Sequence, residues 1–246
     1  MTSVIGVKME RVDYCSATKR IVEWARQFES RYICIANVHM LMEAYDSPGF
    51  ADVINHADLV TPDGMPLVWM MRWKGEKQQE RVYGPSLILY VLESAAQENI
   101  PVGFYGGTPE VLATLIKQMQ TRFAKMNVAF ALSPPFQAMN AAEDAEVVEQ
   151  INQSGTRILF VGLGCPKQER WMAAHRGRVN AVMLGVGAAF DFHAGFKPQA
   201  PVWMQNMGLE WLFRLATEPR RLWRRYLYHN PRFVFLAAAD LLGMYK

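Results

Sequence analysis

The sequence predicts an α/β protein, with a Rossmann-like, mainly parallel sheet flanked by helices and a basic, helical C-terminal appendage. Three observations support this fold class. Short apolar runs alternate with helical segments of about ten to fifteen residues, as in βα units. Two of the runs, 157–161 and 181–184, are almost wholly apolar and lead into glycine, which is typical of strands buried on both faces. After Pro201 the alternation stops and only helical patterns follow.

The elements are expected in the following order. Residues 4–12 are extended, and Ser16 caps the first helix. Strands follow at 32–36, 58–61, 102–105, 128–131, 157–161 and 181–184. Helices cover 40–45, the stretch from after a break at 47–49 to about 56, 86–98, 109 to about 125, and 142–153, with Thr108 as a cap and Pro109 in a first turn. The C-terminal helices break near Pro219 and Pro231. We place an α/β domain at 1–203 and the appendage at 204–246.

Length and composition narrow the class of protein. A chain of 246 residues can bury one core with an appendage, and 51% hydrophobic with 20% charged residues excludes a disordered chain. Three cysteines without a C-x-x-C pair give neither a disulfide framework nor a zinc site, which fits a reducing compartment. The N-terminus lacks the pattern of a signal peptide, and no apolar run reaches the roughly 18 residues of a spanning helix.

The charge is unevenly distributed. The net charge is +3, but residues 204–246 hold seven cations and three acids, so this segment is +4 and the preceding body is −1. Aromatic residues alternate with the arginines, as they do on an interfacial helix. The pattern predicts a tail with an anionic partner. The alternative is an amphipathic helix pair that packs on the body.

Two polar, glycine-rich loops follow the central strands, at 162–171 and 185–192. Glycines allow a ligand to approach the backbone, and a helix that starts at Pro166 offers free N–H groups to an anion. The loops therefore fit a phosphorylated ligand, and equally the tight turns of an ordinary doubly wound domain. Lysine replaces the third glycine of a dinucleotide fingerprint, and no Walker A motif is present.

Polar side chains follow four of the predicted strands. They are Asn37 and His39, Thr61 and Asp63, Tyr105 to Thr108, and Gly162 to Arg170. Because the carboxyl ends of parallel strands share one edge of a sheet, these groups are expected to converge.

Asp63 lies between Pro62 and Gly64, just past an apolar strand, where a carboxylate suits a general base. The alternative is an aspartate that caps the next helix. The histidines form no recognisable metal site, and His39 is either a ligand contact or a structural residue. No nucleophile elbow is present and Cys165 lacks an evident base, so covalent catalysis is not expected.

The motifs together resemble the WecG/TagA/CpsF family of glycosyltransferases (glycosyltransferase family 26). The resemblance rests on G-x-G-x-P-K-Q-E-x-W at 162–171, G-V-G-A-x-F-D at 185–191, G-L-E-W-L-x-R-L at 208–215, N-x-H at 37–39, P-D-G at 62–64, R-V-x-G at 81–84 and F-x-G-G at 104–107. They occur in the family's order from about residue 3 to residue 228.

The resemblance implies an inverting enzyme that needs no metal or other cofactor. It would move glucose, N-acetylmannosamine or its uronic acid from a UDP-sugar to a polyprenyl-diphosphate-linked saccharide during exopolysaccharide, capsule or teichoic-acid assembly. It would be cytoplasmic and peripheral on the anionic inner face of the cell membrane, with no nucleic-acid partner. The apolar segment 233–239 would either dip into the interface or form a homo-oligomer contact.

The resemblance also assigns roles. Asp63 would be the base, Gln168 would hold the donor sugar or its diphosphate, Arg81 would hold the acceptor or a phosphate, and Asn37 would position the sugar. Ile35 stands where some members have threonine. Further substrate contacts are expected from His39, Thr61, Tyr105, Gly106, Gly107, Gly162, Gly164, Lys167, Gly187, Asp191, Arg214, Arg221 and Arg224. Two competing hypotheses for the function are a nucleotide-dependent oxidoreductase of Rossmann type and a non-catalytic membrane-associated scaffold.

Overall fold

The computed structural model describes residues 1–135, 137 and 139–244 and confirms the predicted α/β class. Six strands form one sheet in the order β4-β3-β8-β7-β5-β6. Their bounds are β3 (Arg31–Ala36), β4 (Leu59–Pro62), β5 (Val102–Gly106), β6 (Val128–Leu132), β7 (Ile158–Gly162) and β8 (Val182–Gly185). The pairings β3–β8, β8–β7, β7–β5 and β5–β6 are all parallel.

The chain forms two compact units, which are described separately. The first unit contains 1–13, 35–83 and the chain from Pro198 onward, and the second contains 14–34 and 84–197. The C-terminal segment therefore belongs to one unit with two N-terminal segments. The division at residue 203 stays a prediction.

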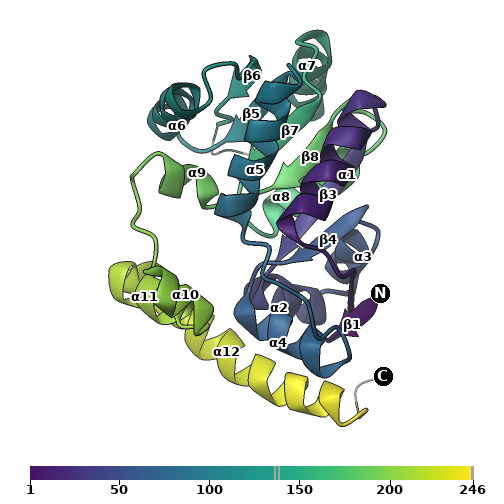
Figure 1. Ribbon diagram of the computed structural model, residues 1–246, viewed down its shortest axis with the longest axis vertical. Coiled ribbons are helices and arrows are strands. Elements are labelled where there is room, and N and C mark those ends of the chain that lie inside the picture. Colours follow the sequence, from purple (N-terminus) through teal and green to yellow (C-terminus); the bar gives the residue numbers. More distant parts are fainter. Residues whose placement is uncertain (136, 138, 245–246) are drawn as a thin grey trace. The chain divides into compact units, whose positions relative to one another are not determined.

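The second unit holds most of the sheet. Its helices are α1 (Tyr14–Arg26), α5 (Gly84–Gln97), α6 (Pro109–Arg122), α7 (Ala141–Gln153), α8 (Lys167–His175) and α9 (Ala189–His193). Helices α1 and α5 pack against each other, and α1 also contacts β7 and β8 (Figure 1). Ile158 to Val161 of β7 are fully buried, as expected for an apolar strand covered on both faces.

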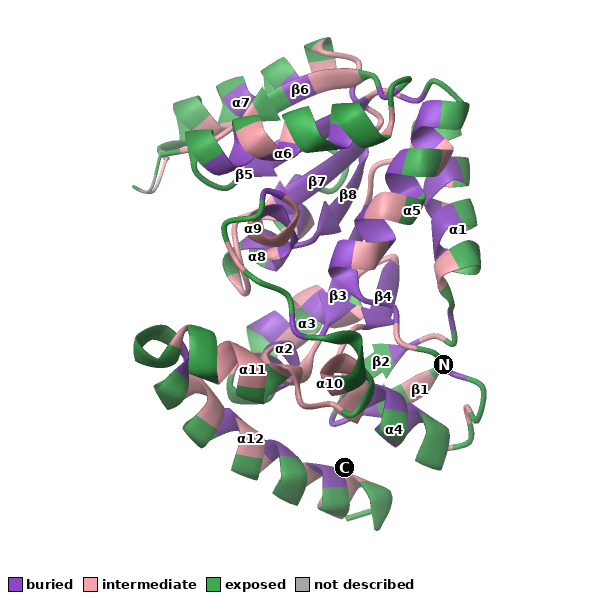
Figure 2. Cartoon of the chain, turned by 60° about the vertical axis from the view of Figure 1, so that its left-hand side comes forward, coloured by how far each residue is buried: buried purple, intermediate pink, exposed green. Residues whose placement is uncertain are grey.

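The first unit places the C-terminal helix against two N-terminal helices. Besides the hairpin β1 (Thr2–Val4) and β2 (Val7–Met9), it contains α2 (Val38–Asp46), α3 (Pro48–Asn55), α4 (Met65–Trp73), α10 (Val202–Asn206), α11 (Glu210–Thr217) and α12 (Pro219–Leu241). Helix α12 packs along α2 and α4 (Figure 1). Figure 2 shows that its buried positions form a narrow line on an otherwise open helix; they are Leu222, His229, Phe233 and Ala237.

Two ion pairs fix α12 at separate points. Lys74 Nζ lies 2.6 Å from the carboxylate of Asp240, and Asp240 also accepts a hydrogen bond from the backbone N–H of Ile5. Nearer the middle of the helix, Arg232 pairs with Asp46 through its Nη1 and Nη2. The appendage is thus packed on its own unit. In the described part of the chain, no helix combines the length and apolar character needed to cross a membrane.

Several predicted boundaries were wrong. The first helix begins at Tyr14, two residues before Ser16, and α6 ends at Arg122 rather than near 125. The predicted break near Pro219 is confirmed, since Pro219 starts α12. Pro231 lies inside α12, where it removes one backbone donor. The helix continues because its buried residues on both sides of Pro231 pack on α2 and α4, and tertiary packing outweighs the local cost.

Candidate active site

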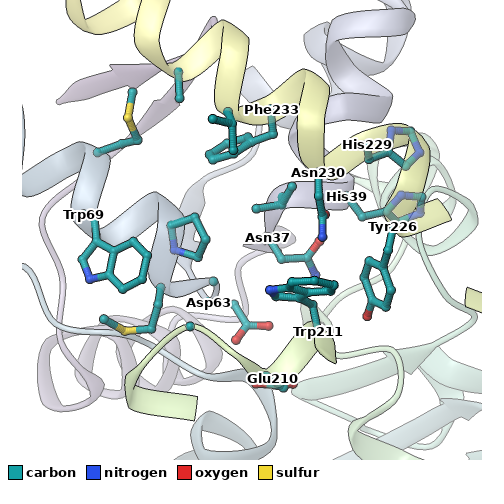
Figure 3. Close-up of a pocket in the computed structure, with 18 of the residues that line it drawn as sticks. Asn37, His39, Asp63, Trp69, Glu210, Trp211, Tyr226, His229, Asn230 and Phe233 are labelled. Carbon is teal, nitrogen blue, oxygen red and sulfur yellow. The ribbon is translucent and has the colours of Figure 1, made fainter. Parts of the chain in front are cut away.

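A cavity of about 650 Å³ lies entirely within the first unit, a size typical of small-molecule sites (Figure 3). One part of its wall is polar. It includes Asn37, His39, Asp63, Arg81, Gln205, Glu210, Arg214 and Arg225. The rest is mainly apolar. Most of it comes from α4 and α12, with Met65, Pro66, Trp69, Met70, Trp73, Phe233, Val234, Ala237, Ala238 and Leu241. The cavity is therefore amphipathic, with charged groups beside an apolar part. We call this part, lined by the residues of α4 and α12, the apolar arm.

Asp63 is held rigidly at the end of β4. Its backbone N–H donates to the carbonyl of Ala36 at the end of β3, with an N···O distance of 2.8 Å. Pro62 accepts from the N–H of Val82 at 2.9 Å, which joins the turn to the segment that carries Arg81. The N-cap of α4 is Gly64, and no side chain caps this helix. Asp63 is therefore not a helix cap.

One guanidinium joins two carboxylates at the polar end. Nη2 of Arg81 lies 3.1 Å from Oδ1 of Asp63 and 2.5 Å from Oε2 of Glu210. Its Nε donates to the backbone carbonyl of Asp63, and its Nη1 donates to Gln205 Oε1 at 3.2 Å. The guanidinium also stacks on Tyr83, 4.0 Å from the ring centroid. These contacts fix the position of Arg81, and through it the facing carboxylates.

The environment makes Asp63 a stronger base than a free aspartate. Burial raises its pKa to about 6, Arg81 opposes this shift, and the negative charge of Glu210 adds to it. Its side chain keeps 16% of its surface exposed, so it remains accessible from the cavity. A carboxylate with a pKa of about 6 is mostly ionised at neutral pH and accepts protons better than an ordinary one.

Two predicted site residues at the start of α2 share this cavity. Asn37 is the N-cap of α2, where its Oδ1 accepts from the N–H of Met40 at 3.2 Å. His39 lies one turn before Glu43 on the same helix, and its ring is 5.3 Å from that of His229 on α12. Figure 3 shows both histidines and Tyr226 on the α12 side of the cavity.

The predicted glycine-rich site lies in the second unit. Gln168 is 4% exposed; its Nε2 donates to Glu169 at 2.7 Å and its Oε1 accepts from the N–H of Gly164 at 3.1 Å. Burial also raises the pKa of Glu169 to about 6. The amide of Gln168 therefore holds the loop together in the described structure.

Close packing explains two of the glycines, and backbone conformation explains a third. A Cβ on Gly106 would lie 2.5 Å from the carbonyl carbon of Gly162, and one on Gly162 would lie 2.6 Å from the ring of Phe190. Gly107 has φ +70°, in the left-handed region that glycine favours. Gly164 and Gly187 also have positive φ, but only Gly164 has open space around it.

The remaining predicted contacts fall into three groups. Thr61 and Tyr105 are buried, with Tyr105 packed on Trp171. Lys167 is exposed, and Asp191 pairs with Lys197 at 2.9 Å in the second unit. Among the arginines, Arg214 lines the cavity, whereas Arg221 and Arg224 are exposed on α12. The individual ligand roles of all these residues stay predictions.

Residues that the sequence did not single out complete the cavity. Glu210 and Gln205 come from the segment after Pro201, and Trp69 and Trp73 come from α4. Glu210 stands inside the G-L-E-W stretch, so the pattern contained this residue without indicating its partner. Its contact with Arg81 joins residues 129 positions apart.

The parallel sheet and the strand-end carboxylate beside a cavity are features of an α/β enzyme. The chain matches the Glycosyl transferase WecG/TagA/CpsF family over residues 2–246 and belongs to that family. It is therefore a glycosyltransferase. It is 32% identical over 209 residues to the N-acetylglucosaminyldiphosphoundecaprenol N-acetyl-beta-D-mannosaminyltransferase of Bacillus spizizenii, covering 85% of this chain and 79% of that relative.

Proposed function

We propose that this glycosyltransferase moves a hexose of the N-acetylmannosamine type from a UDP-sugar to a polyprenyl-diphosphate-linked saccharide. The activity named for the Bacillus spizizenii relative supports this choice of sugar and acceptor. The observation that carries the proposal is the carboxylate of Asp63, which faces an amphipathic cavity and has a pKa of about 6.

In the proposed step, Asp63 takes the proton of an acceptor hydroxyl. The hydroxyl oxygen forms a bond to the anomeric carbon of the donor sugar, and the bond from that carbon to UDP breaks. The electron pair of the broken bond leaves with UDP, and the configuration at carbon inverts because attack occurs opposite the leaving group. Arg81 positions Asp63 and limits the rise of its pKa.

The two parts of the cavity match the two parts of the proposed acceptor. Arg214 and Arg225 line its polar part and can pair with a diphosphate. Trp69 and Phe233 line the apolar arm, which suits the first units of a prenyl chain. Because this arm lies between α4 and α12, the C-terminal helix would help to bind the acceptor.

The donor and the membrane complete the proposal. The glycine-rich loops of the second unit would bind the UDP-sugar through backbone N–H groups and the cation of Lys167, while Gln168 would hold the loop in shape. The exposed face of α12 bears Arg221, Arg224 and Phe235, a combination that suits an anionic lipid surface. We therefore propose that the protein acts at the inner face of the cell membrane.

Asp63→Asn tests the base directly. The amide keeps the shape of the side chain but cannot accept the proton, so turnover should fall by about 10²-fold or more. Transfer from UDP-N-acetylmannosamine to a lipid-diphosphate N-acetylglucosamine acceptor is scored by product mass. The matched control is Asp52→Asn on α3, where the aspartate is exposed and lies outside the cavity.

Binding of UDP by calorimetry should be nearly unchanged in Asp63→Asn, which separates loss of chemistry from loss of fold. If this variant turns over as fast as the parent, Asp63 is not the base. If the parent transfers no sugar but binds dinucleotides in preference to UDP, the proposed substrate class is wrong.

A further inference from the structure

Two helices of the first unit bring three metal-ligating side chains together at the cavity wall. His39 and Glu43 are four residues apart on α2 and share one face of that helix. His229 on α12 faces them, and Figure 3 shows its ring beside that of His39. One ligand atom from each residue lies within 4.8 Å of the other two.

The spacing approaches that of an occupied site. Nδ1 of His39 is 3.7 Å from Oε1 of Glu43, and Nε2 of His229 is 3.6 Å from the same oxygen. The ligand atoms of a tetrahedral zinc ion lie roughly 3.3 Å apart, because each bond is about 2.0–2.1 Å long. Small side-chain movements would therefore bring the three atoms onto one ion.

A second observation concerns the burial of His229. This residue is 8% exposed, and its Nδ1 is buried without a hydrogen-bond partner among the described residues. The polar ring is thus held in the α2–α12 contact by the packing of the two helices rather than by a hydrogen bond at Nδ1. The nitrogen that would bind the ion is Nε2, which lies 3.6 Å from Oε1 of Glu43.

We propose that His39, Glu43 and His229 bind one divalent ion of the zinc type. Two imidazoles and a carboxylate suit zinc and related transition metals, whereas magnesium and calcium prefer oxygen ligands alone. The ion would join α12 to α2 and so hold the C-terminal helix over the acceptor cavity. It has no part in the proton transfer proposed for Asp63.

The charges around the cluster are balanced. Glu43 and Asp46 contribute two negative charges, and Arg225 and Arg232 act on His229 with two positive ones. Arg232 is engaged by Asp46. Local repulsion therefore does not exclude a cation, and Glu43 supplies a negative ligand to it.

Titration of the full chain with zinc tests the site. The protein is stripped with a chelator, dialysed and titrated with ZnCl₂ in a calorimeter, with MgCl₂ as the comparison ion. We expect one tight zinc ion per chain and no comparable magnesium binding. His229→Ala and Glu43→Gln should each weaken zinc binding at least about tenfold. His56→Ala is the matched control, since His56 is exposed in the same unit.

Limited trypsin digestion gives an independent readout. Cleavage at the arginines of α12 should slow when zinc is added to the parent or to His56→Ala, and should be unaffected by zinc in His229→Ala. Circular dichroism checks that each variant is folded, and Glu43→Gln replaces His229→Ala if the latter does not fold. The proposal is overturned if the parent binds no zinc, or if both cluster variants bind it as the parent does.

Discussion

Charged groups at the cavity of the first unit converge on one guanidinium, whereas polar groups at the glycine-rich strand ends of the second unit bond to their own loop. Arg81 contacts both Asp63 and Glu210 beside a cavity of about 650 Å³. Gln168 instead bonds to Glu169 and to the backbone of Gly164. The first arrangement holds a carboxylate of raised pKa at the cavity wall, and the second fixes a backbone shape.

This difference shows what glycine patterns can and cannot indicate. Gly106 and Gly162 are required because β5 and β7 end in close contact and Phe190 covers them. The same glycines would be needed without any ligand. An isolated P-D-G turn carried less information in the sequence, yet it places at the cavity a carboxylate whose pKa is raised by burial.

The largest expected effect tests the packing role of the second unit. In Gly162→Ala the new Cβ would lie 2.6 Å from Phe190, so the free energy of unfolding should fall by about 1–3 kcal/mol. Gly49→Ala is the control, because Gly49 lies in α3 with nothing within 4 Å of the added atom and should be neutral or stabilising. Urea unfolding gives both values.

The second substitution Phe190→Leu should recover part of the stability lost in Gly162→Ala, since a smaller side chain makes room for the methyl group. A stable Gly162→Ala that no longer binds UDP would indicate the opposite, that Gly162 is needed for ligand approach rather than for packing.

The next prediction concerns the arginines of the C-terminal segment. Arg214 lines the cavity, and Arg221 and Arg224 are exposed on α12. Arg214→Ala should therefore slow transfer even to a short, soluble acceptor. The double change of Arg221 and Arg224 to Ala should spare that reaction but weaken binding to anionic vesicles by about 2 kcal/mol, since each cation contributes about 1 kcal/mol.

Vesicle sedimentation and transfer rates measure the two effects separately. Binding of the parent should also weaken as salt rises, because the lipid attraction is screened. If Arg221 and Arg224 are needed with the soluble acceptor as well, they act on the substrate and not on the membrane.

The sequence predicted the strands better than the site. Continuous apolar runs such as Ile158–Val161 identify buried strands almost to the residue. Helix α4 was missed because Met65–Trp73 is apolar and has no capping side chain, and Pro231 was misjudged because its effect depends on packing. The position of Asp63 at the site was predicted because it follows directly after a strand. The contact between Arg81 and Glu210 could not be predicted from the sequence, because only tertiary packing brings together residues that are 129 positions apart.

The smallest expected effect is the most specific test of the cavity's electrostatics. If Asp63 is the base, kcat/KM should fall as the pH drops through about 6, because the protonated carboxyl cannot accept a proton. Glu210 raises this pKa and Arg81 lowers it. Glu210→Gln should therefore move the acid limb of the pH profile to lower pH, and Arg81→Gln should move it to higher pH.

The control Asp52→Asn is remote from the cavity and should leave the acid limb of the pH profile in place. Shifts of a few tenths of a pH unit in opposite directions would be difficult to obtain from any group that does not face both residues. A limb that moves the same way in both variants would assign the titrating base to another residue.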